Sequence, residues 1–340
     1  MPALYRPDID GMRGFAVLFV LVFHAFPERL PGGFVGVDIF FVISGFLITR
    51  IIFSDMDRGS FSPATFYARR VRRIFPALIV VLIASVALGY QLMLVPDLTS
   101  LCRNTAASAL FSANLMLLSE TGYFDIDAHL KPLLHLWSLG IEEQFYLVWP
   151  WLLLVVPRPW FVRFVIAVMV SSFALNILLI HHYPSATFYL PVTRAWELMA
   201  GALVARYQPA RGARSGLIAA AGVIAIGVSL FWFNSRTVFP GWAAALPVAG
   251  TMLLLCSKES LFNRTILGNR IAVNVGLISY PLYLWHWPLL VFTQIYRSGL
   301  PLTNLQRVLL LALSFALAWL TYKFVEKPIR FGKRASSPDW

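Results

Sequence analysis

The chain has 340 residues, of which 59% are hydrophobic and 13% are charged. Soluble globular chains contain about 45–50% apolar and about 25% charged residues. The composition therefore excludes an ordinary soluble domain and indicates a polytopic membrane protein, as does the mean hydropathy of +0.71. The net charge of +12 would suggest nucleic acid only on a soluble surface, so we expect membrane lipid, and no nucleic acid, as its partner.

Two further signals are negative. Cys102 and Cys256 show no metal-ligand spacing, and no metal site is expected. Residues 25–28 read Ala-Phe-Pro-Glu, which is not a small-residue cleavage site. The first apolar run is therefore expected to be retained as a helix.

Ten apolar stretches are long enough to cross a bilayer as helices of roughly 20 residues. In chain order they are 11–27, 35–53, 75–95, 137–156, 160–180, 188–205, 215–233, 239–256, 274–296 and 304–322. An eleventh stretch, 101–118, carries polar residues such as Arg103 and Asn104, mostly at helical spacing. We expect it to be an amphipathic segment, interfacial or re-entrant.

Loop charges set the orientation of these spans. With ten spans and a cytoplasmic N-terminus, 21 of the 28 Lys and Arg residues fall in cytoplasmic segments, as the positive-inside rule requires. Counting 101–118 as a span would move the basic loops 158–163 and 206–214 outside and destroy this bias. The sequence therefore predicts an all-α polytopic integral membrane protein with about ten transmembrane helices and both termini in the cytoplasm.

A charged side chain inside a span costs on the order of 2.5–3.5 kcal/mol, so each one needs a reason. Arg13 and His24 stand eleven positions apart on the first predicted helix, or about 16 Å at the helical rise. That spacing resembles the reach of an extended pantetheine arm, with CoA at one end and the carried acyl group at the other. The alternatives are a cytoplasmic anchor for Arg13 and a hydrogen-bonded core position for His24.

Asp38 lies on the outer side of the second predicted helix, at a depth similar to that of His24. A carboxylate there could fix the imidazole tautomer and raise its basicity, or it could form a polar pair that holds two helices together. The nearby Gly33, Gly36 and Gly45 are expected to serve close helix packing.

Four arginines in five positions stand just before the third predicted helix: Arg69, Arg70, Arg72 and Arg73. Guanidinium groups can grip phosphates bidentately. The run therefore predicts a phosphate site, with orientation and anionic lipid binding as the alternative.

The outer start of the fourth predicted helix carries adjacent carboxylates, Glu142 and Glu143. If the helix begins by His135, then His135, Glu142 and Tyr146 share one face, which would line a polar cavity for a hydroxyl substrate. Paired carboxylates inside a membrane are usually functional.

Two other sites with polar side chains inside spans are weaker candidates for a catalytic role. Arg194 and Glu197 are three residues apart, which allows a local ion pair with an architectural role. His286 lies beside a proline inside the ninth predicted helix, where core hydrogen bonding and cavity lining are both open.

Taken together, these segments resemble the membrane acyltransferase-3 family, which includes bacterial O-antigen and peptidoglycan O-acetyltransferases. The resemblance covers essentially the whole chain and rests on residues 6–24, 32–49, 66–76, 135–146 and 279–288. It implies a bacterial inner-membrane enzyme that moves acetyl from cytoplasmic acetyl-CoA to a hydroxyl of an extracytoplasmic polysaccharide. Lipopolysaccharide O-antigen, peptidoglycan and exopolysaccharide are the acceptors considered.

The same resemblance suggests roles for the residues. Arg13 and His24 would be the signature functional pair, and Arg69 to Arg73 would hold CoA phosphates. We expect the catalytic groups to be His24, Asp38, Glu142 and Glu143, and the substrate-site lining to be His135, Trp137, Tyr146 and His286. Whether His24 is a general base or a transient acyl carrier is left open.

The membrane acyltransferase domain is expected over 1–330, with a cytoplasmic tail at 331–340. The closing segment resembles members that continue into one more helix and an SGNH-hydrolase-like domain, which is not expected within 1–340. We expect either a truncated or standalone form, or a separate SGNH-type transferase that completes the transfer. The competing hypothesis is a secondary transporter or flippase with an intramembrane His/Asp/Glu proton relay. That hypothesis gives the arginine run no use.

Overall fold

The computed structural model describes residues 5–120, 130–206 and 212–332. Within these ranges the chain is helical and contains no strand, which confirms the predicted all-α class. It forms two compact units, each built from two separated stretches of chain. Unit 1 comprises Met1–Phe61 and Ile141–Leu277, and unit 2 comprises Ser62–Gly140 and Ile278–Trp340.

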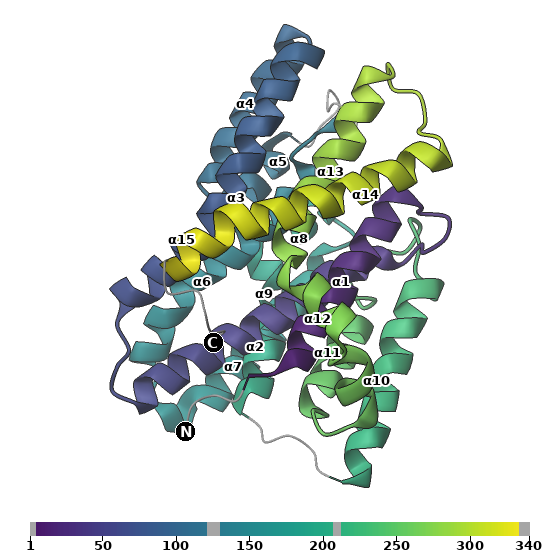
Figure 1. Ribbon diagram of the computed structural model, residues 1–340. Coiled ribbons are helices and arrows are strands. Elements are labelled where there is room, and N and C mark those ends of the chain that lie inside the picture. The colour runs from purple at the N-terminus through teal and green to yellow at the C-terminus, as the bar shows by residue number, and fades with distance from the viewer. Residues whose placement is uncertain (1–4, 121–129, 207–211, 333–340) are drawn as a thin grey trace. The chain divides into compact units, whose positions relative to one another are not determined.

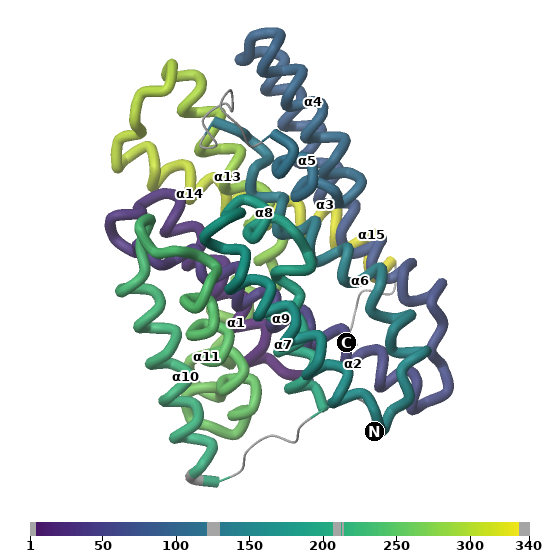
Figure 2. Tube along the Cα trace, turned by 180° about the vertical axis from the view of Figure 1, so that it is seen from behind, coloured from purple at the N-terminus to yellow at the C-terminus, as the bar shows by residue number. Residues whose placement is uncertain are grey.

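Unit 1 holds the first helices and the middle of the chain. Its elements are α1 (Pro7–Ala25), α2 (Gly36–Asp57), most of α6 (Trp137–Val155), α7 (Phe161–Leu179), α8 (Pro184–Tyr189), α9 (Pro191–Arg206), α10 (Ala213–Trp232), α11 (Ala245–Cys256) and α12 (Arg270–Leu277). Helix α9 packs along both α2 and α7, and α1 packs along α12. Helices α10 and α11 also lie side by side, as Figures 1 and 2 show from opposite directions.

Glycines allow the helices of unit 1 to approach closely. A Cβ atom built on Gly45 of α2 would lie 1.9 Å from the carbonyl oxygen of Leu198 on α9, so the two backbones touch at this point. Gly33 and Gly36 face the backbone of α1 almost as closely, with oxygens 2.3 Å from their built Cβ atoms. The prediction that these three glycines serve helix packing is confirmed.

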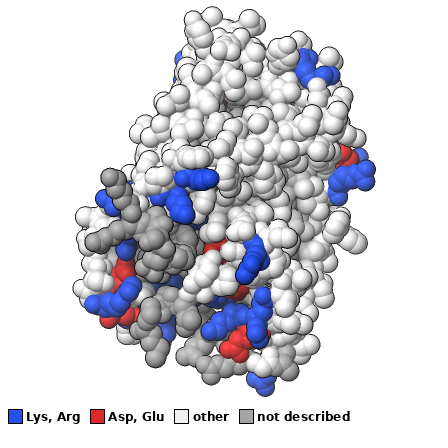
Figure 3. Space-filling view, in the orientation of Figure 1, with Lys and Arg blue, Asp and Glu red and all other residues white. Residues whose placement is uncertain are grey.

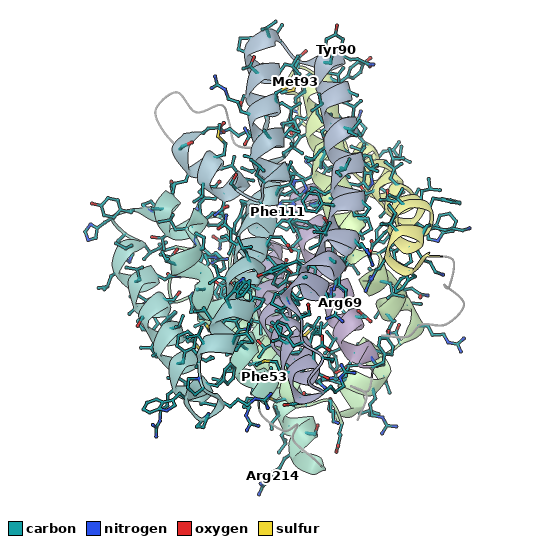
Figure 4. The ribbon with its side chains drawn as sticks, turned by 90° about the vertical axis from the view of Figure 1, so that its left-hand side faces the viewer. Phe53, Arg69, Tyr90, Met93, Phe111 and Arg214 are labelled. Carbon is teal, nitrogen blue, oxygen red and sulfur yellow. The ribbon has the colours of Figure 1, made fainter. Side chains whose placement is uncertain are left out.

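Unit 2 holds a second set of helices. They are α3 (Pro63–Leu92), α4 (Val95–Ala109), α5 (Ala113–Glu120), the first residues of α6, α13 (Ser279–Tyr296), α14 (Asn304–Thr321) and α15 (Lys327–Phe331). Helix α13 packs along α3 and α14. Figure 4 shows α3 and α4 running side by side, with Tyr90 and Met93 near their junction and Arg69 toward the other end of α3.

Helix α3 begins twelve residues before its predicted start. Ser62 caps it by accepting a hydrogen bond from the backbone N–H of Thr65, and Pro63 occupies the first turn. The arginine run was expected to precede the helix and instead lies within it. Arginine is a good helix former, and no glycine or proline stands between Pro63 and the run.

Two other segments are broken rather than continuous. Within 101–118, α4 ends at Ala109, Phe111 adopts a φ of 53°, and α5 begins at Ala113; neither helix is a candidate span. The ninth predicted span is divided at Ile278 into α12 and α13. Apolar periodicity does not reveal a break when both helices are apolar.

Several described helices are long and apolar enough to cross a membrane. They are five in number, or up to six with the divided pair: Gly33–Asp57, Pro63–Leu92, Arg158–Leu179, Arg214–Trp232 and Asn304–Phe331, with Arg270–Leu277 and Ser279–Tyr296. On the face drawn in Figure 3, most of the surface carries no charged side chain. These are features of a polytopic membrane protein, and the count of ten spans stays a prediction.

Candidate functional site

Helix α1 carries Arg13 and His24 without a break, as predicted. Arg13 is half-buried and forms an ion pair with Asp10 at 3.6 Å. His24, in the last turn, is also half-buried and lies beside the Phe23 ring, with centroids 5.4 Å apart. Both side chains retain accessible surface, which a group that meets a substrate requires.

A buried polar cluster that the sequence did not indicate holds the start of α1. Arg6 donates to the Asp8 carboxylate at 2.5 Å and to the backbone oxygen of Leu255 at 3.2 Å. Asn263 donates to the same carboxylate at 3.1 Å. The N-terminal end of α1, the helix that carries Arg13, is therefore tied to Leu255 and Asn263, which lie about 250 positions later in the chain.

Asp38 is completely buried on α2, and its ion pair is formed with Arg194 of α9 at 3.0 Å. Arg194 also pairs with Glu197 at 2.9 Å, so the predicted local pair of Arg194 and Glu197 is present. None of the three side chains has more than 1% of its surface accessible. This geometry fits the helix-holding alternative for Asp38, because a sealed carboxylate touches no substrate.

Glu142 is held quite differently. It is half-buried on α6, and its Oε1 accepts hydrogen bonds from the hydroxyls of Ser44 on α2 and Tyr146 one turn along α6. The predicted alignment of Glu142 with Tyr146 is therefore present. Glu143 is half-buried as well. A second link joins the same helices, because the indole of Trp149 donates to the hydroxyl of Thr49 at 2.9 Å.

In unit 2, the expected lining residues His135 and His286 come together around Tyr283. The hydroxyl of Tyr283 donates to the backbone oxygen of His135 at 2.7 Å and lies 2.8 Å from Ser138 Oγ. The two histidine rings are 5.6 Å apart in an edge-on arrangement. His286 Nδ1 lies 2.6 Å from the backbone oxygen of Tyr283, which requires a proton on Nδ1.

Helix α6 starts where the predicted span 137–156 starts, so the condition that the helix begins by His135 is not met. Leu134–Leu136 form a 3-10 turn, and α6 begins at Trp137. His135 therefore precedes the α-helix, so the α-helical spacing that aligned it with Glu142 and Tyr146 does not apply. Both His135 and Trp137 are buried.

The arginine run covers one stretch of α3. Arg69 and Arg72 are exposed, whereas Arg70 and Arg73 are half-buried. Arg70 also lies over the Phe66 ring, with its guanidinium carbon 5.9 Å from the ring centroid. At helical spacing, the four guanidinium groups spread over more than one face of α3.

Two residues that form hydrogen bonds in the candidate site were not predicted from the sequence. Ser44 and Tyr283 are polar residues inside apolar stretches, and a hydroxyl in a span is itself a signal of interhelical hydrogen bonding. That signal names no partner, since both partners are distant in sequence. In the described part of the chain, no group of three or more His, Cys, Asp or Glu side chains is placed to hold a metal ion.

Comparison with known proteins identifies the family. Residues 6–323 match the acyltransferase domain of the acyltransferase-3 family. The chain is 32% identical to the putative membrane-bound transacylase BcsY of Komagataeibacter xylinus, over 96% of this chain and 83% of that protein. No solved structure matches.

Two longer relatives are named as O-acetyltransferases. The chain is 33% identical to the peptidoglycan O-acetyltransferase OatA of Listeria monocytogenes and 30% identical to the O-acetyltransferase OatA of Staphylococcus aureus. Each match covers 96% of this chain but only 56% and 57% of those proteins, respectively. The domain match over nearly the whole chain shows that this protein is a member of the acyltransferase-3 family and an acyltransferase.

Proposed function

We propose that this protein transfers an acetyl group from cytoplasmic acetyl-CoA to a hydroxyl of an extracytoplasmic envelope polysaccharide. The observation that carries the proposal is the match of residues 6–323 to the acyltransferase domain, together with relatives named as O-acetyltransferases. Peptidoglycan, lipopolysaccharide O-antigen and exopolysaccharide are the acceptor classes. Membership of an acyltransferase family favours this function over the transporter alternative.

The proposed placement is the inner membrane of a bacterium, with ten spans and both termini in the cytoplasm. The bias of 21 out of 28 basic residues toward the cytoplasmic segments supports this topology. It places Arg13 and the arginine run on the side where acyl-CoA is found. A separate SGNH-type transferase is a proposed partner for final delivery to the acceptor.

The proposed roles follow from chemistry and exposure. Arg72 and its neighbours in the run would bind the phosphates of acetyl-CoA bidentately. Arg13 and His24 would act at the two ends of α1, with His24 as base or transient acyl carrier. Glu142 would accept the proton of the acceptor hydroxyl, because its carboxylate is half-buried and held by hydroxyls rather than by a cation.

The test measures release of free CoA thiol from acetyl-CoA by purified protein in lipid nanodiscs, with a bacterial envelope extract as acceptor. Native protein is compared with His24→Ala and Arg13→Ala, and with His181→Ala as a matched control, because His181 is exposed and distant from α1 in sequence. We expect turnover in the native protein and the control, and a loss of at least about 100-fold in the other two. Folded native protein that neither binds nor consumes acetyl-CoA would contradict the proposed function.

A further inference from the structure

Two hydroxyls converge on one carboxylate oxygen in unit 1. Ser44 Oγ, from α2, and Tyr146 Oη, from α6, both donate to Oε1 of Glu142. Ser44 and Tyr146 are buried, with 7% and 6% of their surfaces accessible. Tyr146 is four residues after Glu142 on the same helix, whereas Ser44 comes from another helix 98 positions away. The carboxylate is thus clamped from two directions.

The other oxygen of this carboxylate, Oε2, is neither held by hydroxyls nor sealed from solvent. Glu142 Oε2 accepts no hydrogen bond from any residue that the structure describes, and it is not among the sealed polar atoms. Glu142 as a whole is half-buried. A carboxylate with one oxygen immobilised and the other open can accept a hydrogen bond from a hydroxyl that enters from outside.

Two other carboxylates of unit 1 are held by a cation instead of by hydroxyls. Asp38 and Glu197 are fully buried and paired with the guanidinium of Arg194. Glu142 has no such cation among the described residues. A guanidinium would bind the carboxylate as a permanent ion pair, whereas two hydroxyls fix its orientation and leave it able to take up a proton.

The helix that presents Ser44 is held firmly. Gly45, the next residue, is in contact with the backbone of α9, where a built Cβ would lie 1.9 Å from Leu198 O. Further along α2, the Thr49 hydroxyl accepts from the Trp149 indole of α6 at 2.9 Å, and both residues are fully buried. The two helices that carry Ser44 and Glu142, α2 and α6, are therefore also joined by the hydrogen bond between Trp149 and Thr49.

We infer that Ser44 and Tyr146 are positioning residues that hold Glu142 Oε1 so that Oε2 receives the proton of the acceptor hydroxyl. This inference rests on the proposed function. In the step it describes, the hydroxyl oxygen bonds to the acyl carbon as its proton passes to Glu142 Oε2. The bond from the acyl carbon to the thioester sulfur breaks, and Glu142 returns the proton so that the products are the ester and free thiol.

The test is a double-mutant cycle on turnover, with kcat and acceptor KM measured separately. We expect Ser44→Ala to lower kcat by about 10–100-fold with little change in acceptor KM, and Ser44→Thr, which keeps the hydroxyl, to retain most of the activity. Tyr146→Phe should act like Ser44→Ala. In a Glu142→Gln background, Ser44→Ala should have no further effect, because the base that it positions is already gone.

Ser314→Ala is the matched control. Ser314 is a fully buried serine on α14 whose hydroxyl donates to the Leu310 backbone oxygen of its own helix at 2.8 Å, so its loss should leave kcat unchanged. Thermal midpoints and gel-filtration profiles of all variants verify folding. A Ser44→Ala loss of the same size in the Glu142→Gln background would overturn the inference, as would an acetyl group found on Ser44 by mass spectrometry after acid quench.

Failure of the proposed function would look different. Native protein would then release no thiol from acetyl-CoA, and the catalytic role of the clamp would fall with it. The hydrogen bond itself would still appear as coupling between Ser44→Ala and Glu142→Gln in their thermal midpoints. Catalysis by native protein without coupling in kcat would reject the positioning role alone.

Discussion

Asp38 of α2 and Arg194 of α9 form a 3.0 Å ion pair whose side chains are almost completely sealed from solvent. Three aromatic rings surround the guanidinium carbon at 5.5–5.9 Å, those of Phe41, Phe188 and Phe239. Water is thus replaced by carboxylates and ring faces, which are the groups that stabilise a buried guanidinium. The cluster joins α2, α8, α9 and the segment before α11 within unit 1.

Removing the cation should destabilise the protein strongly. In Arg194→Met, Asp38 and Glu197 would remain buried without a counter-charge, and breaking such a pair costs about 3–5 kcal/mol. Arg58→Met is the matched control, because Arg58 pairs with Asp55 at 2.8 Å but is 56% exposed; its loss should cost at most about 1 kcal/mol. The measurement is thermal unfolding in detergent followed by tryptophan fluorescence. Equal unfolding midpoints for the two variants would show that the buried ion pair stabilises the protein no more than the exposed pair does.

The contact of α2 with α9 leads to a second prediction. Gly45→Ala introduces a Cβ 1.9 Å from a backbone oxygen, so the helices must move apart, and overpacking of this kind costs about 1–3 kcal/mol or more. Gly227→Ala on α10 is the control, since a Cβ there meets nothing within 4 Å. That change should leave stability unchanged or raise it by up to about 1 kcal/mol. The prediction is wrong if Gly45→Ala unfolds at the native midpoint.

Local spacing made part of this architecture predictable from the sequence. The pairs Arg194–Glu197 and Glu142–Tyr146 are three and four residues apart, so helical geometry alone brings each pair together. The apolar runs likewise predicted where most helices lie, because burial or lipid contact needs a long apolar stretch. The role of Gly45 followed from the absence of a side chain inside such a run.

Other features could not be predicted because they depend on pairing between distant segments. The partner of Asp38 is 156 positions away, and the partner of Ser44 is 98 positions away. The sequence left two roles open for Asp38: support of His24, at a similar depth on the preceding helix, or a polar pair that holds two helices together. Tertiary packing decides such partners, and one sequence carries no direct signal of it.

The arginine run leads to a prediction about the donor. Arg72 is exposed on α3, so Arg72→Ala should leave stability unchanged and raise the KM for acetyl-CoA by about 10–100-fold, as expected for the loss of a charge-assisted hydrogen bond. The KM for acetyl-CoA of Arg72→Lys should lie between the values of the native protein and Arg72→Ala, because lysine keeps the charge but not the bidentate geometry. Steady-state kinetics in nanodiscs provide the measurement.

Lys327→Ala is the control for this effect. Lys327 is an exposed basic residue on α15, which is predicted to lie on the same membrane side as the run. Its removal should leave the KM for acetyl-CoA unchanged. Equal effects of Lys327→Ala and Arg72→Ala would indicate a general attraction of anions and would argue against a phosphate site on α3.

The ten-span topology makes a prediction about which loops face the cytoplasm. The chain has only two cysteines, so a variant in which Cys102 and Cys256 are serine offers a clean background for single cysteines. Exposed positions Ser60 and Glu259 are predicted to be cytoplasmic, and exposed Ser235, between α10 and α11, is predicted to face outward.

A membrane-impermeant maleimide applied to spheroplasts should therefore label Ser235→Cys, and it should label Ser60→Cys and Glu259→Cys only after lysis. Ser60 precedes 101–118 and is cytoplasmic whether or not that segment spans the membrane, so it serves as the internal reference. If 101–118 crosses the bilayer, Ser235→Cys and Glu259→Cys exchange their labelling while Ser60→Cys does not change. The break around Phe111, where α4 ends and α5 begins, argues for the first pattern, because a span of roughly 20 residues needs a continuous or well-packed helix.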